Sequence, residues 1–306
     1  MCDEKTEREN EAWLKRKGLT RRSMAAIGIS AGAIAILPGC ASPEDTDGDG
    51  GDTEGASMTA LTKSDVEITT SEGVCDAYFV HPAEGAHAAV LVCPDIYGLR
   101  PAFRQMADRL ASSGYAVLTY NPFYRSAPAP VTQPGDSFSD PDTRTRLSGY
   151  RAKMTANGIA ADAKTFADWL SAQDGVDASR GMGATGYCMG GPVVLRTVAA
   201  VPDQFKAGAT FHGGGLVTQG EDSPHLLIPQ MQAGFLIAIA ENDDEKDPEA
   251  KTVLKDTFAA NDLSAEIEVY EDAMHGWCPP DSHVYNEEQA EKAWSRLLAL
   301  LDTNLA

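Results

Sequence analysis

The most constraining feature of this sequence is a regular alternation of short apolar segments with amphipathic ones, which begins near Leu61 and runs to the C-terminus. The segment Ala88–Cys93 is continuously apolar, which is typical of a buried strand. The segment after it places Phe103, Met106 and Leu110 at helical spacing. Alternation of this kind requires a mostly parallel sheet with helices on both faces. We therefore predict an α/β fold, in which ligands bind outside the carboxyl ends of the strands.

The individual elements follow from the same periodicity. We expect strands at Val66–Thr70, Cys75–Val80, Ala88–Cys93, Tyr115–Tyr120, Gly181–Thr185, Ala207–Phe211, Phe235–Ala240 and Ala265–Tyr270. We expect helices at Pro101–Ser113, Thr143–Gln173, Gly190–Ala200, Pro248–Ala260 and Glu287–Leu301. A polar, proline-rich loop is expected over about residues 121–142.

The beginning of the chain departs from this pattern and has the features of an export segment. Residues 1–22 carry seven basic residues against five acidic ones and end in the pair Arg21-Arg22. The apolar run Met24–Leu37 follows, and its 14 residues are fewer than the roughly 20 that a membrane-spanning helix needs. A basic segment before such a run is typical of a signal peptide, and the paired arginines resemble the address of the twin-arginine export route.

The sequence at the end of this apolar run is compatible with two kinds of processing. Leu37-Pro38-Gly39-Cys40 resembles the lipobox of bacterial lipoproteins, in which the cysteine is acylated, whereas simple cleavage after Ala41 is the alternative. The stretch 41–60 has six acidic residues and no basic one, which is typical of a flexible tether. We therefore divide the chain into an export signal (1–40), a tether (41–60) and one α/β domain (61–306). We expect an exported protein, either periplasmic or anchored to the membrane as a lipoprotein.

The charge of the chain bears on its partners. It has 45 Asp and Glu residues against 25 Lys and Arg residues, a net charge of −20. Binding to nucleic acid needs a basic face, and docking on anionic lipid needs one too, so the composition argues against both. Membrane attachment is then expected only through a lipid on Cys40. A negative field also repels anionic substrates, which favours neutral or weakly charged ones.

The sharpest local signal is the sequence GYCMGG, which begins at Gly186 and lies between a predicted strand and a predicted helix. It has the Gly-x-nucleophile-x-Gly form of a nucleophile elbow, in which larger flanking side chains would collide with the strand and helix around the turn. Such a turn lifts the Cys188 sulfur into a cleft and points the N–H group of Met189 at the same space. A sulfur near a helix N-terminus is favoured as the thiolate. A buried structural cysteine in a glycine-rich turn is the alternative interpretation.

An elbow nucleophile needs an acid and a histidine later in the chain, in that order. Asp243 and Asp244 follow the predicted strand Phe235–Ala240, and His275 follows the last predicted strand. His275 is thus placed to deprotonate Cys188, while a carboxylate fixes the tautomer of its ring. Their positions in the sequence do not distinguish Asp243 from Asp244 as the acid that orients His275.

The sequence also suggests an oxyanion hole. One donor would be the N–H of Met189, and the second would come from the loop Pro94–Leu99, most directly from Ile96, unless this loop is a plain strand–helix connection. His212 follows a strand and precedes three glycines, so it lies either at the pocket or in a satisfied structural position. No pair of histidines has zinc spacing, and no dinucleotide-type glycine turn occurs. We predict neither a metal nor a cofactor.

Together these motifs resemble the dienelactone hydrolase family of α/β-hydrolases. The matching features are PDIYGL from Pro94, the following helix with ADRLASSGYAVL, NPFYR from Asn121, GYCMGG and finally HGW from His275. The resemblance covers about residues 65–303, and a cysteine in the elbow is the hallmark of this family. It implies an α/β-hydrolase fold with a single catalytic domain.

The resemblance also implies roles for particular residues. Cys188 would be the nucleophile, His275 the base and Asp243 the orienting acid, since the family places its acid three residues after the small residue that ends the strand. An acidic residue of the oxyanion loop, here Asp95, would interact with the resting thiol. The candidate substrate-binding residues are Asp95, Tyr97, Arg125, His212 and Trp277.

Arg125 matches the first of two arginines with which family members that open dienelactone hold the substrate carboxylate. The second would lie four residues after the histidine, where this chain has Pro279. This departure favours a relative that acts on another lactone or on an activated ester.

We therefore expect a monomeric hydrolase of lactones or activated esters that forms a thioester on Cys188. A catalytically inactive or ligand-binding lipoprotein on the same scaffold is the second hypothesis, since a fold does not imply a function. A redox protein is the third, although the chain has no Cys-x-x-Cys sequence.

Overall fold

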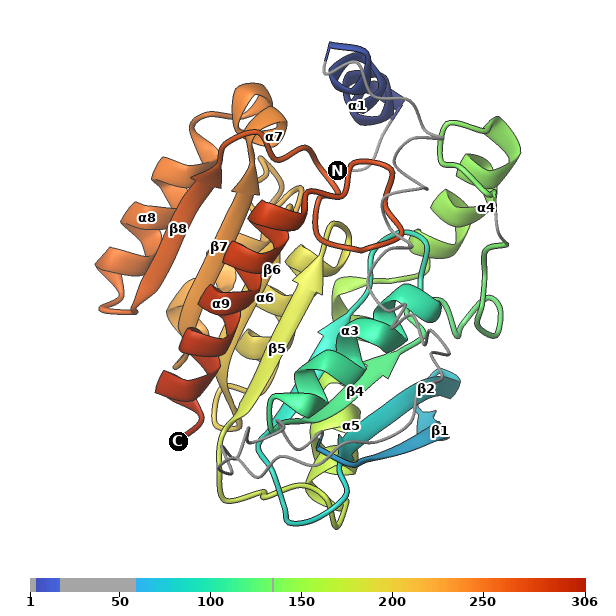
Figure 1. The fold of residues 1–306 in the computed structure, drawn as a ribbon. Helices are drawn as coiled ribbons and strands as arrows, with labels where there is room; N and C mark the ends of the chain where they lie inside the picture. Colours follow the sequence, from blue (N-terminus) through green and yellow to red (C-terminus); the bar gives the residue numbers. More distant parts are fainter. Residues whose placement is uncertain (1–3, 17–58, 134) are drawn as a thin grey trace, which may run out of the picture.

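A computed structural model describes residues 4–16, 59–133 and 135–306 of the chain (Figure 1). The apolar run Met24–Leu37, Cys40 and the acidic stretch as far as residue 58 lie outside the described residues. Within the described ranges no helix combines the length and the apolar character that crossing a bilayer would take.

The described part of the chain folds around one eight-stranded sheet, whose strands lie in the order β1-β2-β4-β3-β5-β6-β7-β8. The strands β1 and β2 form an antiparallel hairpin, β2 pairs antiparallel with β4, and every later pairing is parallel. Their bounds are β1 Leu61–Thr70, β2 Gly73–Pro82, β3 Ala89–Cys93, β4 Ala116–Tyr120, β5 Met182–Tyr187, β6 Phe205–Phe211, β7 Gly234–Ala240 and β8 Ala265–Tyr270.

Helices cover both faces of this sheet (Figure 1). On one face α3 (Pro101–Ser112) and α9 (Glu287–Asn304) pack their apolar residues against the strands. On the other face α5 (Ala156–Ser171), α6 (Gly190–Ala200) and α8 (Ala250–Ala260) do the same. The shorter α4 (Pro141–Arg151), α7 (Glu241–Lys246) and the 3-10 helix η1 (Pro224–Gln230) lie in connections, and α1 (Glu4–Arg16) precedes the sheet in the chain. This arrangement is the α/β-hydrolase fold in a single domain, as expected.

The apolar periodicity located the strands well because the central ones are buried along their whole length. All residues of β3, β4 and β5 are buried, so their sequences read as continuous apolar or small-residue runs.

The prediction of one long helix over Thr143–Gln173 is wrong. The structure divides this stretch into α4 and α5, and Thr155 starts the second helix by accepting a hydrogen bond from the N–H of Gly158 at 3.0 Å. A hydroxyl that caps a helix N-terminus competes with continuation of the preceding helix. The break turns α4 away from α5 and brings it to the carboxyl-end edge of the sheet (Figure 1).

Candidate active site

The elbow forms as the sequence indicates, between the end of β5 and the start of α6. Cys188 has a φ of +53°, and its N–H donates to the carbonyl of Phe211 at 3.0 Å. A Cβ atom on Gly186 would lie 2.3 Å from the carbonyl oxygen of Gly190, and one on Gly190 would lie 2.1 Å from that of Cys93. Both glycines are therefore required by backbone packing, and they hold Cys188 at a sharp, left-handed turn.

The ring of His275 lies against a carboxylate. Its Nδ1 atom is 2.6 Å from Oδ2 of Asp243, and its backbone N–H donates to Oδ1 of Asn242 at 2.8 Å. Asp244 instead binds the ammonium group of Lys251 at 2.6 and 2.7 Å. The structure thus places Asp243, and not Asp244, beside the histidine.

The electrostatic interactions among Cys188, His275 and Asp243 favour a protonated imidazole between two anionic side chains. Burial alone would lower the pKa of His275, but the Asp243 carboxylate and the Cys188 side chain raise it to about 10. Burial would raise the pKa of Asp243, but the adjacent His275 ring holds it below its ordinary value. Because Nδ1 faces Asp243, the hydrogen bond between the His275 and Cys188 side chains uses Nε2. A protonated imidazole at this position stabilises a thiolate.

Two backbone N–H groups flank the nucleophile. Met189 directly follows Cys188, and Ile96 follows the end of β3 in the adjacent part of the sheet. In the described chain neither N–H donates a hydrogen bond to another group, and both residues pack in one apolar cluster with Cys188. Two unused donors beside a nucleophile are what an oxyanion hole requires.

A cavity of about 800 Å³ opens above these groups at the carboxyl ends of the strands. Its size lies within the usual range of small-molecule sites. Six residues expected at the site line it, namely Asp95, Ile96, Tyr97, Cys188, His212 and His275. The hydroxyl of Tyr97 accepts a hydrogen bond from the N–H of Phe138 at 3.0 Å, which fixes the loop after β4 as the opposite wall.

The carboxylate of Asp95 is held by an arginine that the sequence analysis missed. Arg100, which precedes α3, binds both of its oxygens at 2.6 and 3.0 Å and also binds Asp281 at 2.7 and 2.9 Å. Burial raises the pKa of Asp95, and Arg100 opposes that rise. The resemblance implied an interaction of Asp95 with the resting thiol. Arg100 holds both oxygens of the carboxylate, and the nearby Cys188 side chain adds to the rise in its pKa. The sequence did contain a signal for this pair, because Arg100 lies five residues after Asp95 and immediately before the predicted helix that begins at Pro101.

The structure does not bring Arg125 to the catalytic cavity. Its guanidinium binds Asp162 at 2.9 and 3.0 Å and Glu72 at 2.7 Å, and it borders a separate small cavity on the α5 side of the sheet. Two carboxylates from α5 and from the β1–β2 turn satisfy this cation internally. The expectation that Arg125 holds a substrate carboxylate is corrected accordingly.

Trp277 is likewise not part of the cavity wall. It is fully buried, and its ring contacts the rings of His212 and Tyr270 at centroid distances of 5.1 and 5.3 Å. Its large apolar surface belongs to the core behind the site. Trp277 therefore supports His212, and does not touch a ligand in the cavity.

The helix α1 reaches the same cavity, which the sequence did not indicate. Its residues Glu7 and Asn10 line the cavity, and Asn10 donates to the carbonyl of His275 at 3.1 Å. Glu9 pairs with Lys246 of α7 at 2.6 Å. Figure 1 shows α1 above the loop that follows β8, at the edge where the strands end. The helix thus covers part of the entrance to the site.

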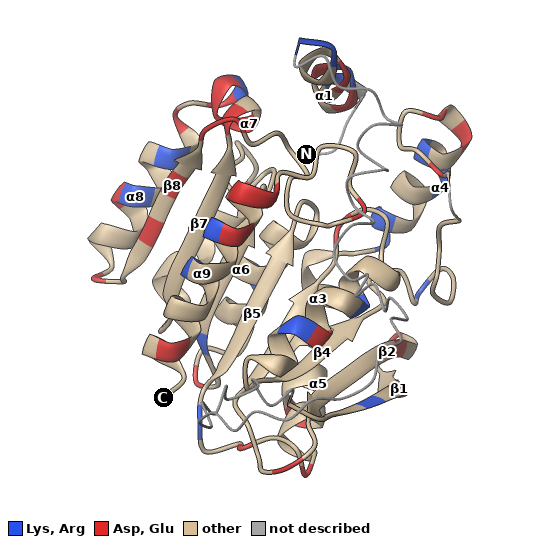
Figure 2. Cartoon of the chain, in the orientation of Figure 1, with Lys and Arg blue, Asp and Glu red and all other residues tan. Residues whose placement is uncertain are grey.

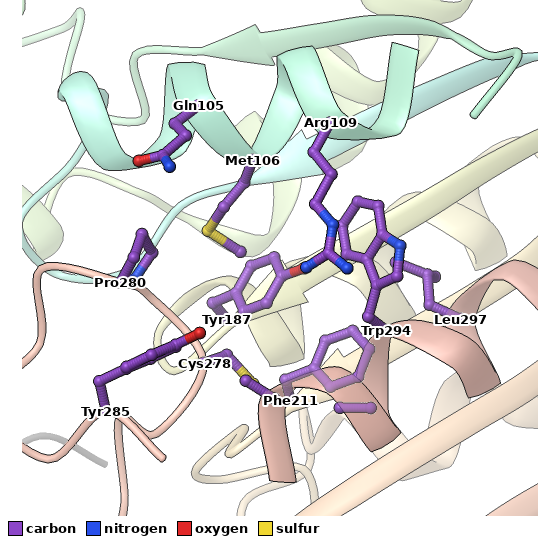
Figure 3. A pocket seen from close by; sticks show the side chains of 12 residues that line it. Gln105, Met106, Arg109, Tyr187, Phe211, Cys278, Pro280, Tyr285, Trp294 and Leu297 are labelled. Atoms are coloured by element: carbon purple, nitrogen blue, oxygen red, sulfur yellow. The ribbon is translucent and has the colours of Figure 1, made fainter. Parts of the chain in front are cut away.

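A second, smaller cavity of about 110 Å³ lies between α3 and α9 (Figure 3). Its walls are mainly apolar, with Met106, Phe211 and Leu297 among them, and Tyr187, which precedes the elbow cysteine, also lines it. Cys278 borders this space, and burial raises the pKa of its thiol well above the ordinary value. This thiol therefore stays protonated and is not a second nucleophile.

The described residues offer no metal centre, since no three His, Cys, Asp or Glu side chains within 4–16, 59–133 and 135–306 are grouped to hold an ion. What the cavity wall does contain is a cysteine at a helix start, His275 and Ile96, while Asp243 contacts His275 from behind and Met189 lines a neighbouring cavity beside α6. This combination is suited to acyl transfer through a covalent intermediate.

The chain is similar to a known protein family and to several of its members. The model of the Dienelactone hydrolase family matches residues 75–305. A protein of Salmonella typhi named "putative carboxymethylenebutenolidase" is 30% identical over 227 residues, which are 72% of this chain and 80% of that protein. A carboxymethylenebutenolidase of a Pseudomonas species (strain P51) is 26% identical over 226 residues, 74% of this chain and 88% of that one.

The fold is shared with solved structures. A "putative dienelactone hydrolase" from Klebsiella pneumoniae superimposes with a TM-score of 0.68 at 24% identity and covers 79% of this chain and 99% of its own. The family match extends over most of the sheet and includes the elbow, the acid and the histidine. The chain therefore belongs to the dienelactone hydrolase family and is a carboxylic ester or lactone hydrolase.

Proposed function

We propose that this enzyme hydrolyses an uncharged lactone or activated carboxylic ester through a triad of Cys188, His275 and Asp243. The observation that carries the proposal is the contact chain at the cavity floor. Asp243 binds Nδ1 of His275 at 2.6 Å, and the other side of the ring faces the elbow cysteine. This is the geometry in which a base activates a nucleophile and an acid orients the base.

In the first half-reaction the Cys188 sulfur attacks the ester carbonyl. The developing oxyanion is stabilised between the N–H groups of Ile96 and Met189. The C–O bond to the leaving group then breaks, and the proton on His275 moves to the leaving oxygen. A thioester on Cys188 remains, and in a lactone the released alcohol stays attached to the acyl group.

In the second half-reaction water attacks the thioester carbonyl. The water gives one proton to Nε2 of His275, and the C–S bond breaks to release the carboxylic acid and the thiolate. An enol or phenol leaving group suits this enzyme, because a poor one would let the first adduct expel sulfur and return to the ester. We therefore expect enol lactones and aryl esters to be the best substrates.

Charge around the cavity supports an uncharged substrate. Four carboxylates line it, from Glu7, Asp95, Asp136 and Asp281, against the single guanidinium of Arg100. Figure 2 shows further acidic residues gathered on α7, at the same edge of the sheet. Carboxylate-bearing esters should therefore have a lower kcat/KM than neutral esters of equal reactivity, and added salt should reduce the difference.

Replacing the nucleophile tests the proposal. The variant Cys188→Ala should lose at least about 10³-fold of the rate on 4-nitrophenyl acetate, because no other group can form the acyl-enzyme. Cys278→Ala, which removes a thiol from the smaller cavity, is the matched control and should keep near-normal activity. Substantial turnover by the Cys188→Ala variant would contradict the triad.

Thiol labelling gives an independent test on the unaltered enzyme. Iodoacetamide at neutral pH should modify Cys188 first and abolish activity in step with that modification. Burial raises the pKa of the Cys93 thiol to about 12, so this cysteine should stay unlabelled until the protein unfolds. Peptide mass mapping distinguishes the two sites. Loss of activity without modification of Cys188, or modification without loss, would refute the proposed nucleophile.

For the N-terminal segment we propose export by the twin-arginine route, followed either by lipidation of Cys40 or by cleavage after Ala41. The support is the sequence alone. Replacing Arg21 and Arg22 by lysine should keep the protein in the cytoplasm, and mass spectrometry of the exported protein would distinguish the two kinds of processing. We further propose a monomer, which light scattering of the purified enzyme tests.

A further inference from the structure

The order of the strands places a second histidine in the middle of the catalytic group. The consecutive strands β5, β6, β7 and β8 are followed in turn by Cys188, His212, Asp243 and His275. His212 thus stands between the strand of the nucleophile and the strand of the acid. Its ring centre is 5.2 Å from that of His275, with the planes tilted by 65°.

The backbone holds His212 in an unfavourable conformation. Its φ is +43°, in the left-handed region that costs a residue with a side chain about 1 kcal/mol or more. The N–H of His212 donates to the carbonyl of Ala238 at 2.9 Å, which extends the β6–β7 pairing by one residue. Trp277 also packs against the ring, with the ring centres 5.1 Å apart. Strain that the surroundings maintain in this way is typical of functional positions.

The ring nitrogens of His212 have no partners although the side chain is buried. Only 1% of the residue is exposed, and neither Nδ1 nor Nε2 makes a hydrogen bond in the described chain. Burial, with the nearby His275, lowers the pKa of His212 to about 3, so the ring is neutral and has one donor and one acceptor. A buried polar ring that lines a cavity is satisfied by water or by a ligand oxygen.

The distance to His275 selects among these partners. A water molecule that bridges two ring nitrogens needs them roughly 4.5 Å apart, given hydrogen bonds of about 2.8 Å. Two rings whose centres are 5.2 Å apart and tilted can meet this requirement. Since Asp243 occupies Nδ1 of His275, the shared water would lie at Nε2, the atom that faces Cys188.

Building on the thioester mechanism proposed above, we infer that His212 holds the water that hydrolyses the acyl-enzyme. The water donates one hydrogen to Nε2 of His275 and the other to the unprotonated nitrogen of His212. As its oxygen bonds to the thioester carbon, the first proton passes to His275 and the second stays on the new carboxyl oxygen. The C–S bond then breaks, and the proton on His275 stabilises the departing thiolate of Cys188.

This role makes the two half-reactions respond differently to substitution. Acylation of Cys188 uses no water, so it does not need His212. Deacylation needs a water held in line with the thioester carbon, and loss of such positioning costs about 10- to 100-fold in rate. A merely structural histidine would affect both steps together.

Stopped-flow kinetics with 4-nitrophenyl acetate separate the two steps. The variant His212→Phe keeps a flat ring but removes both nitrogens, and we expect a full burst of nitrophenol at a rate within about threefold of wild type. Its steady-state rate should fall about 10- to 100-fold, and intact mass should show acetylated enzyme. His212→Asn, which tolerates a positive φ and retains a donor and an acceptor, should deacylate at an intermediate rate. His87→Phe, at a histidine outside the cavity, should match wild type.

Hydroxylamine provides a further readout, because it attacks the thioester without help from a positioned water. It should restore turnover to His212→Phe by a larger factor than it stimulates wild type. Equal loss of acylation and deacylation, or unchanged deacylation, would overturn the inference. If His212→Phe does not fold, His212→Asn provides the test. An Asn variant with the same ratio of acylation rate to deacylation rate as wild type would contradict the inference equally.

These outcomes are separate from a failure of the proposed function. If wild-type enzyme never carries an acetyl group on Cys188, the thioester mechanism itself is wrong. If the acetyl group forms but His212→Phe releases it as fast as wild type does, only the role of His212 is refuted.

Discussion

Gly190 is the position where the smallest change should disturb the active site most. In Gly190→Ala the new Cβ would lie 2.1 Å from the carbonyl oxygen of Cys93 and 2.9 Å from that of Pro94. Carbon and oxygen that are not bonded approach to about 3.3 Å, so the two backbones must separate by roughly 1 Å. Both contacting atoms are backbone, and no side-chain rotation relieves the overlap.

The displacement acts directly on the proposed oxyanion donors. Cys93 and Pro94 lead to Ile96, which packs in one apolar cluster with Cys188 and Met189. A misplacement of about 1 Å at such a position costs about 100-fold in rate. The overpacking itself costs about 1–3 kcal/mol of stability. We therefore expect Gly190→Ala to fold, to lose about 100-fold in kcat/KM, and to unfold at lower denaturant concentration.

The assay combines 4-nitrophenyl acetate kinetics with urea denaturation. Gly149→Ala is the matched control, because Gly149 lies in α4 with no atom near the position of a new Cβ. An alanine there should leave kcat/KM unchanged and stabilise the protein by up to about 1 kcal/mol. The reasoning is refuted if Gly190→Ala keeps its kcat/KM within threefold of wild type while Gly149→Ala behaves as expected.

Two further predictions follow from the site. Against the effect of burial, Asp243 and the Cys188 side chain raise the pKa of His275 to about 10. Protonated His275 therefore stabilises the folded state fully below about pH 6.5, and this contribution is lost as the pH rises towards 10. In urea denaturation at pH 6–10 this decline should flatten in Asp243→Asn and persist in Asp244→Asn; equal profiles would contradict the pairing. Deleting residues 1–58 removes α1, and hence Asn10, from the cavity wall. The kcat/KM for bulky aryl esters should then rise several-fold relative to that for acetyl esters. A constant ratio of the two kcat/KM values would show that the helix does not restrict entry.

The sequence was sufficient where structure depends on neighbouring residues. The buried strands were predicted because each is a short apolar run bounded by turn residues, and the elbow because its glycines lie next to the nucleophile. The order of Cys188, the acid and His275 along the chain also follows from the fold class. Local pattern was insufficient over Thr143–Gln173, because apolar spacing continues through the break, where α4 ends at Arg151 and the hydroxyl of Thr155 caps the start of α5.

Side-chain partnerships across the sheet needed the three-dimensional structure. Arg125 was expected at the substrate because of the motif around it, yet Glu72 and Asp162 reach it from two distant elements. Nothing in the sequence near Arg125 predicts these partners. The pairing of Asp95 with Arg100 is local in sequence, but its effect depends on the burial of both groups.

The sequence by itself determined the fold class and the glycine-flanked elbow that carries Cys188, because these depend on apolar periodicity and on short motifs. The tertiary structure decided which aspartate faces His275. Asp243 and Asp244 are adjacent on α7, and a rotation of about 100° per residue points one to the histidine and the other to Lys251. It also placed His212 and α1 at the cavity. Contacts between residues far apart in the chain depend on strand order and burial, which no local pattern contains.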